Sequence, residues 1–219
     1  MAQIEYRTRI ILILLFGVSF AYVEATVVVY LRELLYPEGF TFPLKLMPLN
    51  LITIELFREL VSIVMLVAVA AVTGKKFWER FGYFITLFGV WDIFYYIWLK
   101  VTIDWPSSLL DWDILFLIPI PWIGPVIAPV LVALLMVITG LSITNLFIRG
   151  YTFRPTVLAW VLSVVGTAAL LFSFMGDTGA TLHQQMPQPY MYGFLIVGLL
   201  LYLIAYLVSY RKTITDSVS

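Results

Sequence analysis

The chain has 219 residues, of which 62% are hydrophobic and 12% are charged, and its formal net charge at neutral pH is zero. Soluble domains carry about 25% charged residues, so this composition predicts a membrane protein, and the lack of any basic run excludes nucleic acid as a partner. Cysteine is absent and His183 is the single histidine, which excludes disulfides, cysteine-held iron–sulfur clusters and bis-histidine haem within this chain.

Six apolar runs are each long enough to cross a bilayer as a helix, which takes about 20 residues. They are Arg9–Leu31, Leu49–Thr73, Phe81–Val101, Pro125–Ile148, Pro155–Met175 and Tyr190–Tyr210. We expect the first run to be a retained helix, because it is too long for a signal peptide and shows no cleavage signature. The sequence therefore predicts an all-α polytopic membrane protein with six transmembrane helices, forming a single domain over residues 1–219.

A proline-rich stretch, "DWPSSLLDWDILFLIPIPWIGPVIAPV" (104–130), separates the third and fourth helices. Its apolar run is too short to span a bilayer, and proline breaks helix interiors because it lacks an N–H. We expect a surface turn around Trp105–Asp111, followed by a short half-helix or re-entrant piece at Trp112–Ile118. The acids of this stretch are expected to be solvated turn and cap residues; they are Asp104, Asp111 and Asp113.

The basic residues indicate the orientation of the helices. If both termini are cytoplasmic, the inner side holds Arg7, Arg9, Lys75, Lys76, Arg80, Arg149, Arg154, Arg211 and Lys212. The outer side then holds only Arg32, Lys45 and Lys100. This is the bias of the positive-inside rule, so we expect both termini to lie in the cytoplasm.

Charged residues interrupt the second apolar run, "NLITIELFRELVSIVMLVAVAAV" (50–72), at Glu55, Arg58 and Glu59. Glu55 and Glu59 lie about 9 and about 15 Å below the outer end of this helix and share one face. Glu24 and Asp92 fall in the outer halves of the first and third helices. An unpaired charge at membrane depth costs about 2.5–3.5 kcal/mol, so we expect these side chains to face one polar pocket near the outer leaflet.

Carboxylates are the ligands that hard divalent cations prefer. Glu24, Glu55, Glu59 and Asp92 are therefore the candidate metal ligands, for Mg, Mn, Fe or Ca. Arg58 is a candidate orienting residue, and His183 is a candidate ligand or acid–base group. Tyr95 lies on the helical face of Asp92 and completes the catalytic candidates. The hypothesis is a metal-assisted reaction on a lipid-soluble or periplasmic substrate.

Other interpretations of the same residues stay open. The charges on the second helix are equally typical of an interhelical salt bridge that fixes packing or of a protonatable relay. The aromatic run "WDIFYYIW" (91–98) is typical of a packing face or interfacial belt, and His183 of a solvated loop residue. Two further functions fit the chain, a proton- or cation-coupled carrier and a non-catalytic subunit of a larger membrane complex. The expected partners are membrane lipids and a lipid-soluble small molecule or neighbouring subunits.

Three stretches carry a resemblance to known sequences: "FAYVEATVVVYLREL" (20–34), "FGVWDIFYYIWLK" (88–100) and "LFLIPIPWIGPVIAPV" (115–130). They resemble a set of uncharacterised bacterial multi-pass membrane proteins. The resemblance implies a place in the bacterial cytoplasmic (inner) membrane. It implies no activity, cofactor or site residue.

Overall fold

The structure, a computed structural model, describes residues 2–45 and 47–216. Its elements are α1 (Ala2–Leu35), α2 (Leu49–Thr73), α3 (Phe77–Ile103), β1 (Trp112–Phe116), β2 (Trp122–Pro125), α4 (Ile127–Ile148), α5 (Val157–Met175), α6 (Thr178–Leu182) and α7 (Tyr192–Thr215). Within these residues, six helices are long and apolar enough to cross a membrane. The predicted all-α polytopic fold is confirmed.

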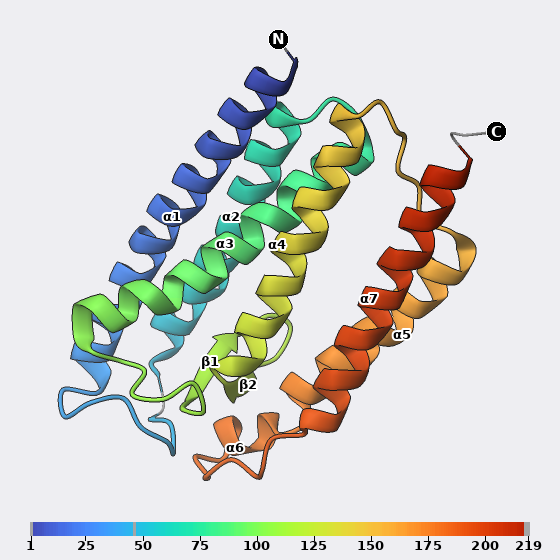
Figure 1. The fold of residues 1–219 in the computed structure, drawn as a ribbon. Coiled ribbons are helices and arrows are strands. Elements are labelled where there is room, and N and C mark those ends of the chain that lie inside the picture. The colour runs from blue at the N-terminus through green and yellow to red at the C-terminus, as the bar shows by residue number, and fades with distance from the viewer. Residues whose placement is uncertain (1, 46, 217–219) are drawn as a thin grey trace.

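The long helices run side by side and leave both chain ends at one end of the bundle (Figure 1). The β-hairpin and α6 lie at the opposite end, which is called the hairpin end below. Helix α3 packs against α1, α2 and α4, and α5 forms a second pair with α7. Helices α1 to α4 therefore form one group around α3, and the α5–α7 pair packs beside α4 through α7.

Small residues bring α3 and α4 into close contact. A Cβ atom added to Gly140 of α4 would lie 2.6 Å from the carbonyl oxygen of Gly82 on α3. One added to Gly82 would lie 3.1 Å from the carbonyl oxygen of Gly140. Membrane helices associate largely through such close backbone approach, because the lipid offers no hydrophobic driving force between them. This contact fixes α3, and with it the face that carries Asp92.

An apolar core fills the space between α1, α2 and α3 and reaches Phe116 of the hairpin. Its buried members are Ile13, Phe20, Ala21, Leu66, Ala70, Tyr83, Leu87 and Trp91. A hydrogen bond also joins two of the helices, because Trp98 Nε1 donates to the carbonyl oxygen of Val18 at 2.9 Å. These contacts hold α1, α2 and α3 together along most of their length.

The segment between α3 and α4 is a β-hairpin, so the prediction of a half-helix at Trp112–Ile118 is wrong. Strands β1 and β2 pair antiparallel, with Trp112 opposite Pro125 and a register shift between Ile114 and Phe116. The cause is local: aromatic and β-branched residues favour strand, and the prolines of the turn cannot continue a helix. Because Val126 N donates to the Asp111 carbonyl at 2.9 Å, the hairpin is fixed to the start of α4.

Candidate functional site

A cavity of about 470 Å³ opens at the hairpin end. Helices α1, α2, α3 and α6, the β-hairpin and the loop at 36–48 all contribute to its walls. The structure brings six of the seven candidate residues to this cavity; they are Glu24, Glu55, Arg58, Glu59, Asp92 and Tyr95. Its volume lies in the range of pockets that take small organic ligands, about 300–1,000 Å³.

Arg58 joins α2 to α1 at one side of the cavity. Its Nε donates to Glu55 Oε2 at 2.8 Å, and its Nη1 is hydrogen-bonded to Glu24 Oε2. The second Glu24 oxygen accepts a hydrogen bond from Ser62 Oγ at 2.8 Å. Glu24 and Glu55 are only 4% and 5% exposed. This is the geometry of the interhelical salt bridge that the sequence left open.

Glu59 holds the turn of the hairpin. Both of its carboxylate oxygens accept a hydrogen bond from the backbone N–H of Leu117, at 2.9 and 3.0 Å. Strand β1 ends at Phe116, so the backbone N–H of Leu117 has no partner on the opposite strand. A charge-assisted bond of this kind is stronger than a neutral one, so Glu59 ties the hairpin to α2.

Asp92 differs from the three glutamates. Within the described part of the chain its carboxyl group takes part in no hydrogen bond and no ion pair. Tyr95 and Tyr96, three and four residues further along α3, line the same cavity. Asp92 is half-buried, and a carboxyl group at this depth without a partner is costly. Asp92 is therefore the acid that is available to a ligand.

Sequence reasoning missed the ion pair between Arg32 and Asp113. Arg32 Nη2 donates to Asp113 Oδ1 at 2.9 Å, and the two residues are 8% and 1% exposed. The guanidinium carbon also lies 4.2 and 3.8 Å from the ring centroids of Phe40 and Trp105. Burial raises the pKa of the Asp113 carboxyl above its ordinary value, although the Arg32 guanidinium acts in the opposite direction.

The expectation that Asp113 is a solvated turn residue is therefore wrong, whereas its two neighbours behave as expected. Asp104 caps the end of α3 and is exposed. Asp111 Oδ2 accepts hydrogen bonds from the backbone N–H groups of Ser107 and Ser108, at 2.7 and 3.1 Å. Asp113 differs because strand β1 turns its side chain inward, toward α1.

The Arg32–Asp113 pair is only partly satisfied. Arg32 Nη1 and Asp113 Oδ2 are buried and have no hydrogen-bond partner within the described residues. Both residues line the cavity. Buried polar atoms are almost always hydrogen-bonded, so these two atoms are available to a polar group that enters the cavity.

The four predicted metal ligands do not form a donor set that fits a divalent ion. Within the described residues, no group of three or more His, Cys, Asp or Glu side chains is placed to hold one. Arg58 lies between Glu24 and Glu55, and Glu59 accepts the Leu117 N–H. A guanidinium at the centre of the set opposes a second cation there. The metal centre stays a prediction that this geometry does not support.

His183 does not line the cavity. It follows the last residue of α6 and is exposed, whereas its neighbours Thr181 and Leu182 contribute to the cavity wall. The structure thus places the candidate imidazole near the mouth of the cavity but not in its lining. Its predicted role as a ligand or acid–base group stays a prediction.

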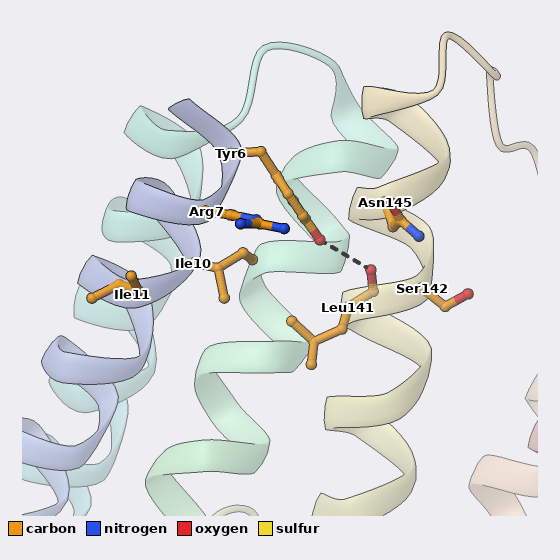
Figure 2. A pocket seen from close by; sticks show the side chains of 7 residues that line it. All are labelled: Tyr6, Arg7, Ile10, Ile11, Leu141, Ser142 and Asn145. Carbon is orange, nitrogen blue, oxygen red and sulfur yellow. Dashed lines mark hydrogen bonds between the residues drawn. The ribbon is translucent and has the colours of Figure 1, made fainter. Parts of the chain in front are cut away.

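A second, more open groove of about 570 Å³ lies between α1 and α4, near the end of the bundle that holds the chain termini. Figure 2 shows Tyr6 reaching from α1 to the Leu141 carbonyl oxygen, with Arg7 beside it and Asn145 on α4. The Tyr6 hydroxyl also contacts Thr144 Oγ1 at 3.1 Å. No acidic residue lines this groove, and none of the candidate residues lies there.

None of the protein-family models, curated proteins and solved structures compared with the chain matches it. The resemblance of three sequence stretches to bacterial membrane proteins stays a prediction.

Proposed function

We propose that the protein binds an elongated, lipid-soluble molecule with a polar end group, and that the cavity at the hairpin end is its ligand or substrate site. The observation that carries the proposal is the combination of one apolar-walled cavity of about 470 Å³ with the unpartnered carboxyl group of Asp92. Pockets for small organic molecules are mostly apolar and contain a few convergent polar groups.

The two sides of the cavity suit the two parts of such a molecule. Val28, Leu31, Leu35, Ile52 and Leu56 form an apolar wall on α1 and α2. Burying an apolar chain against such a wall yields roughly 25 cal/mol per Å². The polar end of the molecule meets the carboxyl group of Asp92 and the free atoms of the Arg32–Asp113 pair. A membrane enzyme acting on a lipid-soluble substrate would use the same arrangement.

The proposal puts the hairpin end on the outer face of the membrane. The basic residues assigned to the cytoplasm lie near the chain termini or in the two connections at that end of the bundle (Figure 1). The positive-inside rule then favours a cytoplasmic location for both termini. Because the apolar core between α1, α2 and α3 fills the bundle behind the cavity, binding is favoured over carriage across the membrane.

Filling the cavity tests the proposal. We expect Val28→Trp to remove a lipid-soluble molecule that copurifies with the wild-type protein, because Val28 lines the cavity and the indole ring would occupy it. The measurement is mass spectrometry of organic extracts from protein in nanodiscs, normalised to protein. Val23→Trp is the matched control, since this valine lies on the same helix, is 55% exposed and does not line the cavity.

The two variants separate the outcomes. The proposal predicts at least a tenfold loss of one stoichiometric molecule in Val28→Trp and full retention in Val23→Trp. Extracts that hold only bulk lipid in the wild type and in both variants, or equal loss in both variants, would contradict it.

A further inference from the structure

We infer that the polar end of the molecule bound in the cavity is a positively charged amino group, with Asp92 as its counter-ion. The inference rests on the proposed function and names the chemical class of its ligand. It follows from how the charged side chains of the cavity are partnered, from the aromatic rings beside Asp92 and from the free oxygen of Asp113.

The cavity is lined by more acidic than basic side chains. Five carboxyl groups and three basic groups line it, and two of the bases are already committed. Arg58 is paired with Glu24 and Glu55, and Arg32 is paired with Asp113, although Arg32 Nη1 has no hydrogen-bond partner within the described residues. The third base, Lys45, is exposed and lies 5.3 Å from the ring centroid of Tyr36, so water solvates it. No basic group within the described residues is paired with Asp92.

Aromatic residues line the cavity together with the unpaired carboxyl group. Trp91, Tyr95 and Tyr96 flank Asp92 on α3, and Phe116 of the hairpin lines the same cavity. The faces of such rings attract cations, with roughly 0.5–2 kcal/mol for each contact. A carboxylate among aromatic rings is the arrangement that recognises an ammonium group, whereas an anionic or purely apolar end would gain nothing from Asp92.

Asp113 supplies a second acceptor independently of Asp92. Asp113 lines the cavity and is only 1% exposed. The Tyr96 side chain lies near its carboxyl group, but the buried Oδ2 has no hydrogen-bond partner of normal geometry within the described residues. Asp113 also lies close enough to Asp92 for the two charges to interact. A primary ammonium group carries three N–H donors, so it can donate to both carboxyl groups at once.

Three amphiphiles with the same alkyl chain test the inference: dodecylamine, 1-dodecanol and dodecanoate. Binding is measured by titration calorimetry on the protein in phosphatidylcholine nanodiscs at neutral pH, with empty nanodiscs subtracted. We expect dodecylamine to bind at least tenfold more tightly than 1-dodecanol, and dodecanoate to bind most weakly. We expect Asp92→Asn to reduce the affinity for dodecylamine about tenfold and to leave that for 1-dodecanol unchanged.

Two further variants keep the result interpretable. Asp92→Glu retains the charge and should retain the preference for the amine. Glu33→Gln removes an exposed acid of α1 that does not line the cavity, and it should leave all affinities unchanged. Equal or tighter binding of 1-dodecanol or dodecanoate would overturn the inference and leave the proposed function standing. Absence of binding by all three probes would also overturn the inference. The proposed function is tested separately, by whether a lipid-soluble molecule copurifies with the wild-type protein and is lost from Val28→Trp.

Discussion

Replacing Arg58 with methionine is expected to lower the free energy of unfolding by about 3–5 kcal/mol, the usual effect of removing one partner from a buried ion pair. Arg58 is bonded to both Glu24 and Glu55. Without it, two carboxylates that are 4% and 5% exposed face each other in the membrane. The measurement is unfolding of the purified protein in mixed micelles by titration with sodium dodecyl sulfate.

A compensating variant identifies the cause of this loss. Replacing both glutamates with glutamine in the Arg58→Met background removes the two uncompensated charges, and it should recover at least half of the lost stability. If the triple variant is as unstable as Arg58→Met alone, packing of the arginine side chain and not its charge would be responsible. Arg58→Lys should fall between the wild type and Arg58→Met, because an ammonium group lacks the fork that reaches both acids.

Asp113→Asn is expected to be the second most damaging change, with a loss of about 3 kcal/mol of unfolding free energy. The substitution keeps the shape of the side chain but leaves the Arg32 guanidinium buried without a counter-charge. Arg32 contacts the aromatic rings of Phe40 and Trp105 as well as Asp113. One residue therefore connects α1, the loop at 36–48, the end of α3 and the hairpin, and we expect the hairpin end to loosen.

The chain contains a matched control for this change. Asp104 is also ion-paired, with Lys100 Nζ at 2.7 Å, but the two side chains are 91% and 49% exposed. Exposed ion pairs contribute little to stability because water screens them, so Asp104→Asn should leave the unfolding free energy almost unchanged. Equal effects of the two substitutions in the same unfolding titration would contradict the structural role given to Asp113.

The sequence could predict the helices because their signal is strong. About twenty predominantly apolar residues have few alternatives to a membrane-spanning helix, and each of the six runs forms such a helix in the structure. The hairpin could not be predicted in the same way. Its ten or so apolar residues show neither a helical nor a clear alternating period, and proline marks only where a helix cannot continue.

The sequence also predicted much of the cavity lining. Helical spacing places Glu55, Arg58 and Glu59 on one side of α2. Because a charged group in hydrocarbon is costly in free energy, these side chains are expected to face the acids Glu24 and Asp92 and not the lipid. What the spacing could not show is which charges satisfy one another. The Glu24–Arg58 contact depends on the rotation of α1 against α2, which no local pattern contains.

Arg32 and Asp113 were missed for a different reason. They lie 81 residues apart, and each stands beside residues typical of a surface: Arg32 near the end of a helix, Asp113 two residues after a turn aspartate. Only the alternation of β1 turns Asp113 inward. Once the half-helix is replaced by a strand, the burial of this acid follows, so the error in local structure caused the error at the site.

Thiol labelling tests most directly the claim that charged side chains converge on an accessible cavity. The chain contains no cysteine, so an introduced cysteine is the only thiol that can react. Leu56 lines the cavity, whereas Ile54 lies two residues nearer the helix end, is 59% exposed and does not line it. We compare Leu56→Cys and Ile54→Cys in nanodiscs with the cationic reagent 2-(trimethylammonium)ethyl methanethiosulfonate. We expect at least tenfold faster labelling of Leu56→Cys, although this residue lies deeper, because its side chain faces the cavity. Equal labelling of the two variants, or faster labelling of Ile54→Cys, would contradict an accessible cavity at this place.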